Sequence, residues 1–130
     1  MALRVEFDAG NKILLLHFDG QLLDDSVPEF SQVIRRYWTA VDARMSIVDL
    51  SSVTEFSVSG NLIVRLTQQE PCIPNGTNRV IVAPKGRVFD LAHMFQILVE
   101  NTRPALSVVH TMAEAFVELG VQSPHFEPLR

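Results

Sequence analysis

The stretch Ile47-Val-Asp-Leu-Ser-Ser-Val-Thr-Glu-Phe-Ser-Val-Ser-Gly60 decides the fold of this chain. Its first residues are mostly apolar, which predicts a short buried strand over 45–50. The polar residues that follow predict a loop, and Ser57 is the predicted N-cap of a helix that carries Leu62 and Leu66. A strand that leads into a helix in this way leaves free backbone N–H groups at the start of the helix, where an anion or a partner can bind.

The flanking hydrophobic pattern predicts an alternation of strands and helices. Period-two alternation over 3–7, a turn at 8–11 and an apolar run over 12–19 predict an N-terminal β-hairpin. Later in the chain, helical spacing or short apolar runs predict helices over 27–41, 88–98 and 112–119 and strands over 79–83 and 106–110. Capping boxes are predicted at Ser26 with Glu29 and at Thr111 with Glu114.

The order β-β-α-β-α-β-α-β-α predicts an α/β fold. We expect a single mixed, mostly parallel five-stranded sheet with an N-terminal antiparallel hairpin and about four helices. A chain of 130 residues, 47% hydrophobic and 20% charged, is typical of one globular domain with a sizeable core. We expect that domain to cover 1–122 and residues 123–130 to form a loose C-terminal tail.

Charge and composition exclude several classes of protein. A net charge of −4 and only two lysines argue against nucleic-acid binding. No apolar run approaches the roughly 20 residues that a membrane span requires. The single cysteine, Cys72, excludes an internal disulfide, and no secretory signal is visible, so we expect a cytoplasmic protein.

No group of residues predicts catalysis or metal binding. The four histidines lack the spacing of metal ligands, and neither a nucleophile elbow nor a phosphate-binding or dinucleotide-binding loop is present. Asp24 and Asp25 are interpreted as first-turn carboxylates near a helix start. We therefore expect no enzyme, no cofactor and no metal.

Two segments are expected to lie side by side where parallel strands end. One is 51–60, and the other is the loop of Lys85, Gly86 and Arg87, which precedes a helix. Helix N-termini, two cations and several hydroxyls predict an anion-binding loop there. The alternative is that Ser57 is only an N-cap and that the two cations are solvated loop charges.

The element order and the segment Val48-Asp-Leu-Ser-Ser-Val-Thr-Glu-Phe-x-x-Ser-Gly60 resemble the STAS domains, the anti-sigma-factor-antagonist family. Arg79-Val-Ile-Val-Ala-Pro84 and Leu106-Ser-Val-Val-His-Thr-Met-Ala-Glu-Ala-Phe116 extend the resemblance to nearly the whole chain. The resemblance implies a non-enzymatic regulatory or scaffolding domain that binds a protein partner, such as a kinase or an anti-sigma-factor-like protein. The partner would bind the loop and N-terminus of the second helix.

The same segment departs from the family at its switch. Signalling members have Asp-Ser-Ser-Gly there, and the first serine of that motif is phosphorylated by the anti-sigma-factor kinase. The corresponding residues of this chain are Ser57, Val58, Ser59 and Gly60, so a valine occupies the acceptor position. Three interpretations follow: Ser57 or Ser59 is phosphorylated instead, the domain binds constitutively, or it has a different ligand. Val58 is either exposed for a permanent contact or buried in the core, which is the interpretation we favour.

The alternative function is a small-molecule or lipid-binding module of the CRAL-TRIO-like type, which shares the superfamily. Large apolar side chains would allow a cavity between helices and sheet: Phe30, Trp38, Phe56, Phe89 and Phe95. A homodimer formed through an exposed face or sheet edge is compatible with either function.

Overall fold

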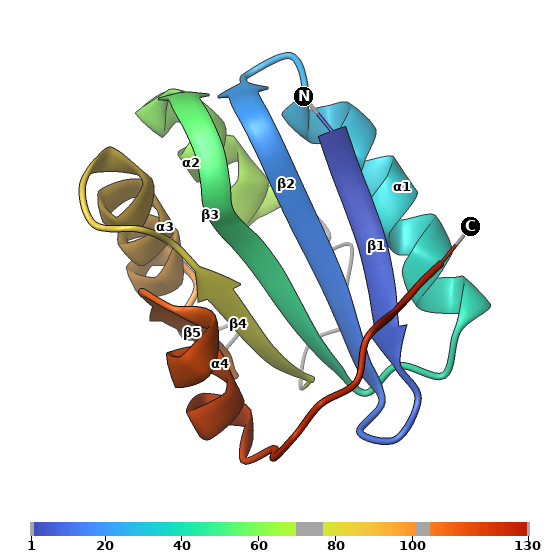
Figure 1. Ribbon diagram of the computed structural model, residues 1–130. Helices are drawn as coiled ribbons and strands as arrows, with labels where there is room; N and C mark the ends of the chain where they lie inside the picture. Colours follow the sequence, from blue (N-terminus) through green and yellow to red (C-terminus); the bar gives the residue numbers. More distant parts are fainter. Residues whose placement is uncertain (1, 70–76, 101–104, 130) are drawn as a thin grey trace.

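A computed structural model describes residues 2–69, 77–100 and 105–129, so Cys72 lies outside the described residues. Within these residues, four helices pack on one six-stranded sheet, and Figure 1 shows how the elements are arranged. In chain order the elements are β1 (Ala2–Asp8), β2 (Ile13–Leu23), α1 (Val27–Ala40), β3 (Met45–Ser57), α2 (Gly60–Gln68), β4 (Asn78–Val82), α3 (Arg87–Leu98), β5 (Leu106–Val109), α4 (Met112–Leu119) and β6 (Glu127–Pro128).

The strand order in the sheet is β5-β4-β3-β2-β1-β6. β2, β3, β4 and β5 are parallel neighbours, and β1 pairs antiparallel with β2 as the predicted hairpin. Each parallel strand is joined to the next by one helix. Because right-handed crossovers that all proceed in one direction place their helices on the same side, α1, α2 and α3 share one face of the sheet. The predicted α/β class and mostly parallel sheet are confirmed.

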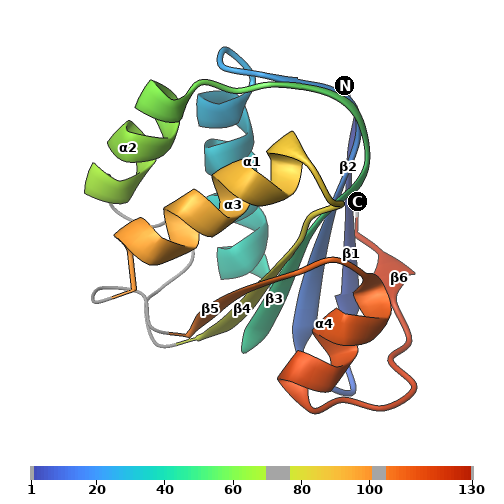
Figure 2. The ribbon, with the colours of Figure 1, turned by 90° about the vertical axis from the view of Figure 1, so that its left-hand side faces the viewer.

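The sheet separates two apolar cores. α1, α2 and α3 cover one face, and α4 lies alone on the other (Figure 2). The larger core contains Leu14, Leu16 and Leu62 among its buried residues. The smaller core, under α4, includes Ile13 and Ala115. The cores are separate because successive residues of a strand point to opposite faces, so the apolar run in β2 supplies both.

β2 and β3 are longer than the sequence predicts. β2 continues to Leu23 and β3 to Ser57, and beyond the end of β4 the two strands pair with each other in a ribbon (Figure 1). Register shifts occur on both sides of Asp19 and Gly20, where Gly20 has a φ of 85°. The polar run after residue 50 is therefore strand and not loop. Polar residues are tolerated there because neither face of the ribbon is fully covered.

Of the two predicted capping boxes, one is wrong and one is confirmed. The predicted capping box at Ser26 is wrong: its side chain makes no cap hydrogen bond, and α1 instead has a proline in its first turn. At α4, the Thr111 hydroxyl accepts a hydrogen bond from the N–H of Glu114 at 3.1 Å, as predicted. Gly120 ends that helix with a φ of 69°, a conformation that glycine adopts at little cost.

The C-terminal residues are ordered against the domain, in contrast to the expected loose tail. Glu127 and Pro128 form a sixth strand on the free edge of β1, and the N–H of Leu129 donates to Val5 O at 2.8 Å. Phe126 stacks on Phe116 with ring centroids 6.3 Å apart. The sequence carries no local sign of this strand because pairing with a distant edge stabilises it. Within the described ranges, no helix is long and apolar enough to cross a membrane.

Candidate docking site at the start of helix α2

Helix α2 begins two residues later than predicted. Its N-cap is Ser59, whose hydroxyl accepts a hydrogen bond from the N–H of Leu62 at 3.1 Å. Ser57, the predicted cap, is instead the last residue of β3. The shift follows from the extension of β3, because pairing with β2 keeps the chain in a strand conformation up to Ser57.

Asp24 holds the same helix start from another part of the chain. The backbone N–H of Ser59 donates to Asp24 Oδ1 at 2.8 Å. A carboxylate at this end is stabilised by the positive end of the helix dipole. The sequence suggests only a first-turn carboxylate of α1, but Asp24 lies in the turn before α1 and serves α2. A contact across 35 residues leaves no local sequence signal.

Arg87 joins the start of α3 to the same segment. Its Nη2 donates to the carbonyl oxygen of Val58 at 3.1 Å. The prediction that the loops after β3 and β4 are neighbours is thereby confirmed, since β3 and β4 are also paired in parallel. Arg87 is therefore more than a solvated charge. Lys85 and Gly86 are exposed in the loop before α3, where Gly86 has a φ of 111°.

The residues at the four motif positions have different environments. Val58 is 2% exposed, so the interpretation that it belongs to the core is confirmed. Ser57 is exposed, and its hydroxyl donates to Glu55 Oε1 at 3.3 Å. Ser59 is half-buried, with its hydroxyl engaged as the cap. Gly60 begins the helix, close to the side chain of Met94 on α3.

Exposed apolar side chains adjoin this segment. Leu23 pairs with Ser57 across the ribbon and is 38% exposed. Val64, one turn into α2, is 42% exposed. The result is a backbone corner held by hydrogen bonds, with an exposed hydroxyl and apolar neighbours, which is suited to contact with another macromolecule.

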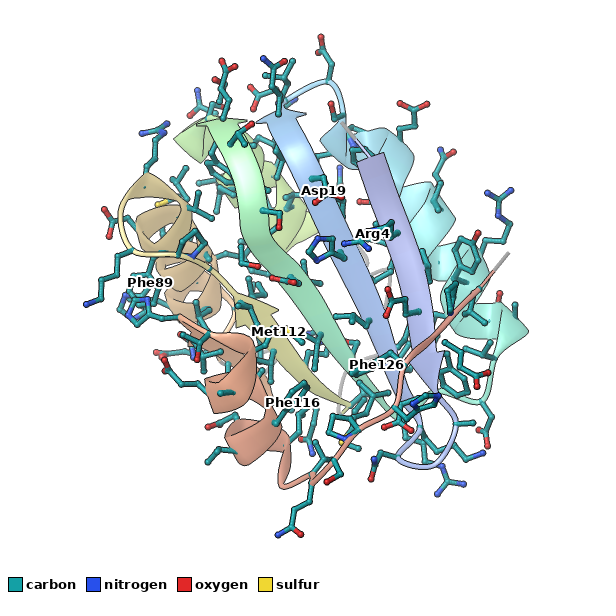
Figure 3. All side chains as sticks on the ribbon, viewed as in Figure 1. Arg4, Asp19, Phe89, Met112, Phe116 and Phe126 are labelled. Atoms are coloured by element: carbon teal, nitrogen blue, oxygen red, sulfur yellow. The ribbon has the colours of Figure 1, made fainter. Side chains whose placement is uncertain are left out.

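A second polar cluster, which the sequence did not indicate, lies on the α4 face of the sheet. His17 Nδ1 is 2.7 Å from Asp49 Oδ2, and His17 Nε2 is 3.0 Å from Asp19 Oδ1. Arg4 pairs with Asp19 at 3.5 Å (Figure 3). Both ring nitrogens of His17 therefore face carboxylate oxygens. Parallel pairing sets His17 directly opposite Asp49, which is a register that periodicity alone does not reveal.

This cluster lacks the geometry of a nucleophilic or metal site. The hydroxyl of Ser51 donates to Asp49 Oδ1 at 2.6 Å, so it is directed to the carboxylate and not to the imidazole. Among the described residues, no group of three or more histidine, cysteine or acidic side chains is arranged to hold a metal. The cluster replaces the apolar core on the part of the sheet face that α4 leaves uncovered (Figure 3).

The architecture defines a STAS-like fold. Among solved structures, the chain is similar to the anti-sigma factor antagonist SpoIIAA in its unphosphorylated form, with a TM-score of 0.57 over 94% of this chain and 100% of that one. The two sequences are 12% identical, and this likeness shows the fold alone. No family model and no curated protein matches the sequence. The fold predicted from the resemblance is thus confirmed.

Proposed function

We propose that this chain is a non-enzymatic regulatory or scaffolding domain that binds a protein partner through the end of β3 and the start of α2. The observation that carries the proposal is the way this segment is held. Asp24 accepts from the N–H of Ser59, and Arg87 donates to the carbonyl of Val58. A backbone fixed in advance loses little entropy when a partner binds, while Ser57 and its apolar neighbours remain exposed.

The structural neighbour supports a protein as the partner. SpoIIAA is an anti-sigma factor antagonist, so a domain of this fold acts on another protein. An anti-sigma-factor-like protein or a kinase is the partner class that follows by analogy. Residue 58 is a valine, which has no hydroxyl group, so this chain cannot be phosphorylated at that position.

The environment of the two remaining serines favours constitutive docking. A phosphate on Ser59 would lie beside the carboxylate of Asp24 and would remove the cap of α2. Ser57 is more accessible, but its neighbour Glu55 also carries negative charge. We therefore expect docking that does not depend on phosphorylation. Of the two serines, Ser57 is the better phosphate acceptor. Lys85, Gly86 and Arg87 remain the predicted anion-binding loop.

Matched variants test the docking site. Ser57→Arg and Val64→Glu place a large or charged group on the proposed surface, whereas Val117→Glu changes a side chain that is 81% exposed on α4. Affinity capture from native lysate, quantified by mass spectrometry, should recover a stoichiometric partner with the unmodified chain and with Val117→Glu. Ser57→Arg and Val64→Glu should each lose at least tenfold of that partner. Equal recovery by all four proteins would place docking elsewhere.

A further inference from the structure

An apolar pocket with a volume of about 180 Å³, partly open to solvent, lies in the larger core between the sheet and helices α1, α2 and α3. α2 packs against α3, whereas α1 packs chiefly on β2, so the helical layer is not continuous over the sheet. Four phenylalanines form much of the lining: Phe18, Phe30, Phe56 and Phe95. The two other aromatic residues predicted to enclose a cavity do not line it. Trp38 packs at the margin of this core, and Phe89 lies against His110 with ring centroids 4.2 Å apart.

The chemistry of the lining restricts what the cavity can hold. Its sole polar side chain among the described residues is Ser31, whose hydroxyl already donates to Val27 O at 3.1 Å. A water molecule needs two to four polar partners to occupy a cavity, and a buried charge needs a counter-charge. The lining offers neither. The cavity therefore suits an uncharged hydrocarbon group.

Size and shape define the ligand further. An apolar cavity of about 150 Å³ in another protein accommodates benzene, and this one is slightly larger. The lining phenyl groups offer the edge and face contacts that aromatic rings prefer. We propose that the cavity is a binding site for a small uncharged aromatic compound, a single ring with at most a short alkyl substituent.

The position of the cavity links it to the start of α2. Val58 and Ile63 both line it and both belong to the segment proposed to bind a partner. A ring in the cavity would contact the inner side of this segment, whose outer side carries Ser57. The binding proposal does not rest on the docking function, because it is tested on the isolated chain without any partner.

Fluorobenzene is a suitable probe. Burial of its ring carbons predicts a Kd on the order of 0.1–1 mM. Titration should broaden and shift the ¹⁹F signal of the probe and shift the methyl signals of Val58 and Ile63. Methyl signals of Val80 and Ala115 in the other core should not respond. At ten times the Kd the melting temperature should rise by about 3–6 °C. No binding, or shifts centred on Val80 and Ala115, would overturn the proposal.

A variant that fills the cavity provides the control. Ala92 is 8% exposed and lines the cavity, so Ala92→Leu occupies part of its volume. Ala92→Leu should weaken fluorobenzene binding at least tenfold. Ala113→Leu, on the exposed side of α4, should bind like the unmodified chain. If Ala92→Leu does not fold, Ser31→Val serves the same purpose. Undiminished binding by a folded cavity-filling variant would refute the assignment.

Discussion

The backbone N–H of Ser59 lies 2.8 Å from Oδ1 of Asp24, a contact that joins the turn before α1 to the start of α2. The two residues are 35 positions apart in sequence. Together with the bond from Arg87 to Val58, this contact fixes the corner between β3 and α2 from two sides. The candidate docking surface is therefore a tertiary assembly of three chain segments.

Asp24→Ala should destabilise the protein by about 1–2 kcal/mol, because the N–H of Ser59 loses its acceptor in a half-buried position. Urea unfolding followed by circular dichroism measures the difference. Asp25→Ala is the matched control, since Asp25 is exposed and should change stability by less than about 0.5 kcal/mol. An equal effect of both substitutions would contradict the role assigned to Asp24.

Substitution of Ser59 and of Ser57 tests which of the two serines caps α2. Ser59→Ala should cost about 1 kcal/mol, because the N–H of Leu62 loses the hydroxyl that accepts its hydrogen bond. Ser57→Ala should change stability by less than about 0.5 kcal/mol, since that hydroxyl is exposed. The free energy of unfolding of both variants would be compared with that of the unmodified chain. A larger loss of stability in Ser57→Ala than in Ser59→Ala would show that Ser57, and not Ser59, caps α2.

Asp8 should make stability depend on pH in the acid range. Burial by itself would raise the pKa of Asp8, but hydrogen bonds from the Asn11 side chain and from the N–H groups of Asn11, Gly10 and His125 outweigh it and hold the pKa below the ordinary value of 3.8. A carboxyl with a depressed folded pKa stabilises the protein above its unfolded pKa. That stabilisation is lost as the pH falls through the folded pKa.

The contribution of Asp8 is measured against Asp8→Asn. The unmodified chain should be more stable than the variant at pH 6–7, and this difference should shrink as the pH falls below about 4. Chemical unfolding at several pH values measures it. A difference that is constant between pH 3 and pH 7 would show that ionised Asp8 does not contribute.

The His17–Asp49 pair should be much more important for stability than the neighbouring surface pair. His17→Leu should destabilise by about 3 kcal/mol, since it removes a partner from the buried carboxylate of Asp49. The double variant His17→Leu/Asp49→Leu should recover part of that loss. Arg4→Ala, which removes an exposed pair with Asp19, should cost less than about 1 kcal/mol. A double-mutant cycle with no coupling between His17 and Asp49 would contradict the contact.

Several features of the fold were predictable because their signals are local. The alternation in β1, the helical spacing of α1 and the cap at Thr111 each depend on residues within a few positions of one another. The burial of Val58 was also expected, because burying an apolar side chain away from water is favourable. The mistaken elements are those where distant pairing overrides local composition. The polar end of β3 is a strand because β2 lies beside it, and β6 exists because the edge of β1 is free.

By itself the sequence determined the α/β class, the order of the elements up to α4 and the segment from Ser57 to Gly60 as the candidate site, because periodicity and turn residues encode these within short windows. The tertiary structure alone decided which serine caps α2, that Asp24 and Arg87 hold its start, and that His17 meets Asp49. Those contacts depend on strand register and on the approach of segments far apart in the chain. No pattern of neighbouring residues specifies such distances.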